Sequence, residues 1–171
     1  MVDNLLARRA GVTEQYKPIT TSAGAADAGK VPALAADGKW DPSLYNPGAD
    51  PSIQITASEA IGAGKFYNLF SDAGTLKARL ADNSNSRPAD GFVKSALAID
   101  ATGAGFPLDS VNSALSGLTP GTNYYLGTAG GVIAVPLDGT DPATAGFIDQ
   151  KLGKALSATE LATDDYDYVV L

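Results

Sequence analysis

Residues 118–135, LTPGTNYYLGTAGGVIAV, predict a turn, a strand, a tight turn and a second strand. Pro120 and Gly121 suit the middle of a β-turn, because proline fixes φ and glycine accepts a positive φ. Residues 124–126 and 132–135 contain the aromatic and β-branched side chains that strands favour. The Gly-Gly pair between them is typical of a two-residue hairpin loop. We therefore expect a β-hairpin here.

Short strands are predicted along the rest of the chain from residue 53 onward, because apolar and polar residues alternate there with a period of two. The expected strands, besides the hairpin, are 53–57, 65–70, 75–80, 92–99, a weaker one at 107–115, 147–156 and 166–171. Residues 100–106 are expected to form a turn, and 157–162 a brief helix. Evenly spaced short strands with glycine-rich turns indicate an all-β domain, a small sandwich or barrel, over residues 51–171.

Residues 1–50 are expected to form an extended N-terminal arm, which could open with a short helix. Asp3 or Asn4 suits the N-cap of that helix, which would lie within residues 1–17, and Gly11 suits its end. Beyond it, residues 18–51 contain five prolines and four glycines, with small residues between them. Such a segment offers too little apolar surface for a core of its own.

Spaced apolar residues along the arm are the candidate partner-binding residues, because each could fill a pocket on another protein. They are Leu5, Leu6, Val31, Leu34, Trp40, Leu44 and Tyr45. Three arrangements are open: the arm wraps its own domain, lies in grooves of neighbouring subunits, or is disordered. The second is favoured, because the single tryptophan of the chain is among these residues.

Composition excludes several classes of function. The net charge of −7 argues against nucleic acid as a partner, since phosphate binding needs clustered lysine and arginine. The absence of histidine and cysteine excludes zinc fingers, Cys–His nucleophiles and disulfide frameworks. No apolar run has the length of a membrane span, and the N-terminus lacks the order of a secretory signal. We expect a soluble protein made in the cytoplasm, with no membrane partner.

No motif predicts catalysis or a cofactor. The densest acidic run, Asp164-Asp165-Tyr166-Asp167, lacks the glycine and closing glutamate of a calcium loop, so a solvated turn is expected there. The glycines of residues 127–131 have no lysine after them, unlike a phosphate-binding loop. We expect no enzyme, no metal and no cofactor.

The order of several segments resembles small virion proteins of tailed bacteriophages, in particular the head-decoration, or capsid-cement, proteins of contractile-tailed phages. The segments are 19–44, 79–82, 88–93, 118–126 and 151–155. Similar Ala-Asp-Gly-Phe-Val and Leu-Thr-Pro-Gly…Tyr-Tyr-Leu modules also occur in phage tail-fibre and baseplate proteins.

The resemblance implies a structural protein on the outside of a capsid, which binds the major capsid protein and holds neighbouring capsomers together, commonly as a trimer or dimer. The alternative is a tail-fibre or baseplate module that attaches to a host glycan through exposed aromatic residues such as Tyr124 or Tyr166. Removal of residues 1–50 distinguishes the two. A cement protein should lose binding to the shell while its β domain stays folded, whereas an attachment module should lose attachment to its own virion and keep glycan binding.

Overall fold

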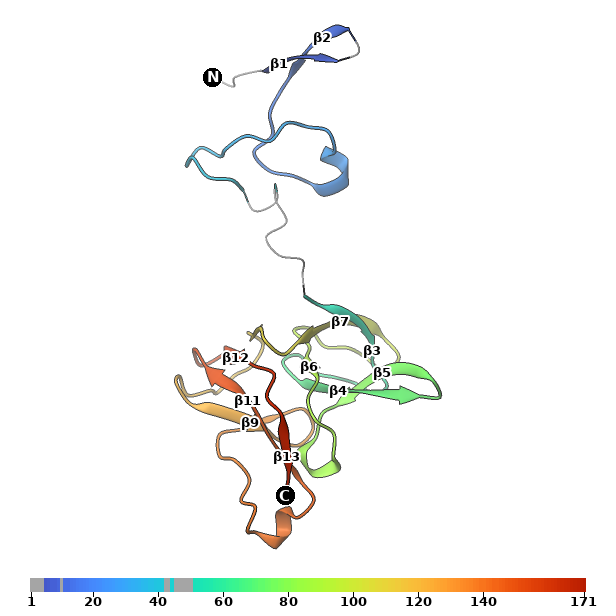
Figure 1. The fold of residues 1–171 in the computed structure, drawn as a ribbon, viewed down its shortest axis with the longest axis vertical. Coiled ribbons are helices and arrows are strands. Elements are labelled where there is room, and N and C mark those ends of the chain that lie inside the picture. The colour runs from blue at the N-terminus through green and yellow to red at the C-terminus, as the bar shows by residue number, and fades with distance from the viewer. Residues whose placement is uncertain (1–4, 10, 42–43, 45–50) are drawn as a thin grey trace. The chain divides into compact units, whose positions relative to one another are not determined.

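The computed structural model describes all residues except 1–4, 10, 42–43 and 45–50. The chain divides into two compact units, Met1–Asp50 and Pro51–Leu171 (Figure 1). We refer to them as the N-terminal unit and the β unit, and describe each by itself.

The N-terminal unit begins with a two-stranded antiparallel hairpin, β1 (Leu5–Arg9) and β2 (Val12–Tyr16). Arg9 lies opposite Val12 in this pair, and Gly11 between them has a φ of 84°. The helix expected within residues 1–17 is therefore wrong. The residues of β1 are good helix formers, but β2 begins with two β-branched residues, and pairing between the two segments outweighs local propensity.

The segment after the hairpin folds back on itself. The backbone N–H of Ile19 donates to Val31 O at 2.9 Å, and Ala33 N–H donates to Ile19 O at 2.8 Å. These bonds close a loop that contains the short 3₁₀ helix η1 (Gly24–Asp27). This part of the expected arm is consequently shorter in reach than a fully extended chain.

The β unit contains two sheets, and all of its paired strands are antiparallel (Figure 1). The first sheet has the order β3-β7-β6-β4-β5; its strands are β3 (Ile53–Thr56), β4 (Phe66–Asp72), β5 (Thr75–Leu80), β6 (Gly91–Phe92) and β7 (Thr102–Pro107). The second has the order β10-β9-β11-β12-β8, with β13 also paired to β11. Its strands are β8 (Val111–Asn112), β9 (Asn123–Leu126), β10 (Val132–Ile133), β11 (Ile148–Ala155), β12 (Leu161–Thr163) and β13 (Tyr168–Val170). The expected all-β fold is confirmed.

Helical structure in the β unit is limited to short 3₁₀ turns, η3 (Asn83–Asn85) and η4 (Pro142–Thr144). Within the part of the chain that the structure describes, no helix has the length and hydropathy of a membrane span.

Most of the predicted strands are present, with shifted ends, and three predictions are wrong. The strand expected at 92–99 is reduced to β6, Gly91–Phe92. The turn expected at 100–106 is instead β7, and the helix expected at 157–162 is replaced by β12. β7 was missed because of Gly103 and Gly105, which suggested a turn. A side chain at Gly105 would collide with Ile55 and Tyr67, so packing rather than a bend requires glycine there.

The predicted hairpin of residues 118–135 is formed by β9 and β10, with Leu126 opposite Val132. Its turn is centred on Ala129 and Gly130, one position earlier than expected. Both have positive φ, 50° and 64°, as a type I′ turn requires, and Gly131 N–H donates to Thr128 O at 3.0 Å.

The turn of this hairpin also joins the two sheets. Gly130 N–H donates to Ala81 O at 2.6 Å, and Phe66 N–H donates to Gly130 O at 3.1 Å. A Cβ atom at Gly130 would lie 2.7 Å from Phe66 O, so only glycine permits this approach. The stretch that predicts the hairpin therefore also fixes how one sheet lies on the other.

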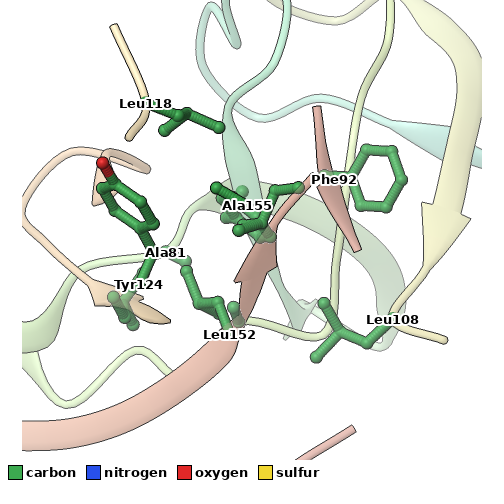
Figure 2. Packing of buried hydrophobic residues seen from close by; sticks show 11 residues of the cluster. Ala81, Phe92, Leu108, Leu118, Tyr124, Leu152 and Ala155 are labelled. Atoms are coloured by element: carbon green, nitrogen blue, oxygen red, sulfur yellow. The ribbon is translucent and has the colours of Figure 1, made fainter. Parts of the chain in front are cut away.

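The main hydrophobic core, the inter-sheet cluster, takes buried side chains from both sheets (Figure 2). It consists of Phe66, Ala81, Ala89, Phe92, Leu108, Leu118, Tyr124, Leu126, Leu152, Ala155 and Leu161. A second, smaller cluster is formed by Ile55, Ala57, Ile61, Tyr67, Ala78 and Val93. Phe66 and Tyr67 are neighbours on β4 and enter different clusters, because successive side chains of a strand face opposite ways.

Buried amide side chains fix the loops between these short strands. Asn83 Nδ2 donates to Leu126 O at 2.9 Å, and Asn112 Nδ2 donates to Gly64 O at 3.0 Å. Gln150 on β11 accepts from Ala89 N–H at 2.7 Å and donates to Ala89 O at 3.0 Å, as a neighbouring strand would. These amides satisfy backbone groups that would otherwise be buried without partners.

Candidate interaction surfaces

The predicted anchor residues belong to the N-terminal unit, in which the described residues form no hydrophobic cluster. Among the residues of the N-terminal unit whose surroundings the structure describes, none is buried. Leu34 and Trp40 are 49% and 50% exposed, Leu6 on β1 is exposed, and Val31 and Leu44 are partly exposed. Leu5 lies in β1, and Tyr45 falls outside the described residues. Neither hydrophobic cluster of the described residues contains any of these anchors.

Local polar contacts, rather than burial, hold this segment in shape. Asp27 accepts hydrogen bonds from Ala23 N–H at 2.6 Å and from Lys30 Nζ at 2.5 Å, within the loop that Ile19 and Ala33 close. These two donors lower the pKa of the Asp27 carboxyl, the Ala23 N–H having the larger effect. Farther along, Ala35 N–H donates to Lys39 O at 2.8 Å. The apolar side chains are thus presented on ordered backbone without being covered by it.

The tyrosines proposed as glycan contacts differ in exposure. Tyr124 lies in the inter-sheet cluster, and its hydroxyl accepts a hydrogen bond from Thr119 N–H at 2.9 Å (Figure 2). It is unavailable to a ligand, so its choice as an exposed aromatic is wrong. Its neighbour Tyr125 is partly exposed, which confirms the expected division of the pair. Tyr166 is exposed, with Lys151 Nζ 4.5 Å from its ring centroid.

The described residues offer few sites suited to binding a metal ion or a small molecule. No three acidic side chains there come together in a way that could hold a metal ion. A depression of about 230 Å³ lies beside the turn of the β9–β10 hairpin and is lined by Ala63, Gly64, Lys65, Ala114, Leu115, Ser116, Gly130, Gly131 and Val132. It is smaller than the roughly 300–1,000 Å³ typical of small-molecule pockets.

A surface that the sequence analysis missed is β13, the strand that pairs with β11 off the main path of the second sheet. Tyr168, Val169 and Val170 are 47%, 62% and 60% exposed, so both faces of this strand reach solvent. The sequence signal was present: three consecutive apolar residues without alternation, directly after the acidic run. The sequence predicts a strand at residues 166–171, and the exposure of β13 is seen only in the structure.

No family model matches this sequence, and no curated protein matches it. Among solved structures, the chain is similar to the N base of the head fiber gp8.5 of bacteriophage phi29, with 13% identity and a TM-score of 0.42. The likeness covers 66% of this chain and 92% of that chain. At this identity and TM-score it assigns the chain neither a shared fold nor a function.

Proposed function

We propose that this chain is a structural protein of a bacteriophage virion, which binds the outer surface of the capsid and cements neighbouring capsomers. The single observation that carries the proposal is the N-terminal unit: none of its side chains whose burial the structure describes is buried, and Leu34 and Trp40 are half exposed. A segment of this kind gains stability by laying its apolar side chains on another molecule.

The energetics favour contact at a few anchors. Full burial of a large apolar side chain contributes about 1.5–3 kcal/mol, so covering the exposed half of one contributes roughly half of that. Ordering one residue of backbone costs about 1–2 kcal/mol. Because local hydrogen bonds already hold residues 19–39 in shape, part of this cost is met before the partner is bound.

The β unit supplies a folded body for such a protein, with its own core. The net charge of −7 suits an exterior position better than one facing DNA. The resemblance to capsid-cement proteins implies two partners. One is the major capsid protein, and the other is further copies of this chain, with which it would form a trimer or dimer. Several weak contacts made by one oligomer sum through their high effective concentration.

The experiment compares binding of the purified chain and of a Leu34→Ala, Trp40→Ala double variant to virions assembled without it. Loss of two half-buried anchors is expected to cost about 1.5–3 kcal/mol, or roughly 10- to 100-fold in affinity, measured by co-sedimentation. Leu76→Ala, which removes an exposed leucine from β5, is the matched control and is expected to bind normally. Electron microscopy of the complex locates the chain on the particle.

Two outcomes would overturn the proposal. One is a double variant that binds the particle as well as the wild type. The other is electron microscopy density for this chain at the tail instead of the shell. That result would support the alternative, an attachment module, in which Tyr166 is an aromatic residue still available to contact a glycan.

A further inference from the structure

The outer edge of β13 has unpaired backbone groups. The backbone groups of Leu171 point to the side of β13 that faces β11. The Leu171 N–H donates to Phe147 O at 2.9 Å, and the Leu171 carbonyl accepts from Gly146 N–H at 2.7 Å. Backbone groups of alternate residues point to the same side of a strand. Val169 therefore faces β11, whereas the N–H and C=O groups of Tyr168 and Val170 point outward. Among the described residues, only β11 pairs with β13.

The side chains of this edge suit an added strand. Tyr168 and Val170 extend from one face of β13 and Val169 from the other, and all three are exposed. Aromatic and β-branched residues form favourable cross-strand pairs. Natural edges are commonly protected by lysine, proline or a bulge, and none of these occurs within β13.

The charged side chains around this edge are mainly acidic, with Lys151 Nζ against the ring of Tyr166. Asp164, Asp165 and Asp167 precede β13, and Asp149 lies opposite Val169 in the β11–β13 register. None of the four takes part in the ion pairs found in the described part of the chain. Asp149 Oδ1 is buried and has no hydrogen-bond partner. A strand that docks here is stabilised if it carries lysine or arginine.

We infer that the free edge of β13 accepts an extended basic segment of a partner protein, which adds to the second sheet as an antiparallel strand. The charge selects this occupant over β13 of a second copy, because self-pairing would bring two sets of these aspartates into one sheet. This edge is a contact surface separate from the anchors of the N-terminal unit, and its partner need not be a capsid protein.

The test uses the full chain and a synthetic peptide, KTVTVRK, with the charge-reversed peptide ETVTVEE as control. Amide hydrogen exchange by NMR is expected to slow about tenfold or more at Tyr168 and Val170 when the basic peptide binds, and not with the acidic one. Val170→Pro removes an outward N–H that the pairing with β11 does not use. We expect this variant to bind the basic peptide with an affinity about tenfold lower, or weaker still. Val135→Pro, at an exposed valine outside the strands, is the matched control.

The inference is overturned if neither amide gains protection, if Val170→Pro binds the basic peptide as the wild type does, or if the acidic peptide binds equally well. Sedimentation that shows a dimer of the chain, abolished by Val170→Pro, would assign the edge to a second copy instead. Amide protection in the wild-type chain decides the matter even where the proline variant folds poorly. A failure here leaves the binding of Leu34 and Trp40 variants to virions unaffected, so the two proposals are tested separately.

Discussion

Replacement of Gln150 by leucine tests how the β unit holds its loops. Gln150 is 2% exposed, and its amide makes both hydrogen bonds of the buried Ala89 backbone, at 2.7 and 3.0 Å. Leucine has a similar volume but neither donor nor acceptor. The variant leaves one buried N–H and one buried C=O unpaired, at about 1–3 kcal/mol each. The gain from a more apolar side chain offsets part of this, so we expect a loss of about 2–4 kcal/mol.

The assay is urea denaturation of the full chain, followed by circular dichroism. The midpoint is expected to fall while the slope stays unchanged, because the variant exposes the same surface on unfolding. Gln54→Leu, at an exposed position of β3, is the matched control and should change stability by less than about 0.5 kcal/mol. If Gln150→Leu were as stable as the wild type, the role assigned to the buried amides would be refuted.

Three further predictions concern a carboxylate, a glycine and an anchor. Burial acts to raise the pKa of Asp82, but hydrogen bonds from Ala129 N–H and from the hydroxyl and N–H of Ser84 lower it overall from 3.8. The ionised carboxylate therefore stabilises the fold above pH 3.8, and this stabilisation is lost as the pH falls through the lowered pKa of the folded state. Asp82→Asn should be less stable than the wild type at pH 7. The difference in stability between the two should be smaller when denaturation is measured near pH 3. Gly153→Ala should lose roughly 3 kcal/mol or more, seen as a lower thermal midpoint, because a Cβ there would overlap Ala162 O at a φ of 155°. Trp40→Ala should leave the denaturation midpoint unchanged, because the Trp40 side chain belongs to neither hydrophobic cluster. A midpoint lowered as much as in Gln150→Leu would show that Trp40 is packed in a core after all.

The strands that the sequence predicted well are those in which local pattern and long-range packing agree. Residues 75–80 alternate in polarity and form β5, and the strand expected at 147–156 is present as β11. β7 was missed because its glycines make room for other side chains, Gly103 for Leu97 and Gly105 for the more distant Ile55 and Tyr67. β1 was missed because its helix-forming residues pair with β2, and a window of local propensity does not include that pairing.

The candidate surfaces follow the same division. Composition indicated that the N-terminal unit could not build a core, and its described residues contain no buried side chain. Under the proposed function, Leu34 and Trp40 contact another protein, and the sequence of this chain does not reveal that protein's surface. The edge of β13 was missed because exposure depends on which strands lie beside it, and its partner β11 is itself placed by pairing with β9 and β12.

Hydrogen exchange with mass spectrometry on the chain, free and bound to virions assembled without it, tests the central claim most directly. Contact with a neighbouring molecule through the anchors predicts slower exchange across residues 31–41 in the bound state, with β4 and β11 unchanged. Equal exchange of residues 31–41 in the free and bound chain would contradict it.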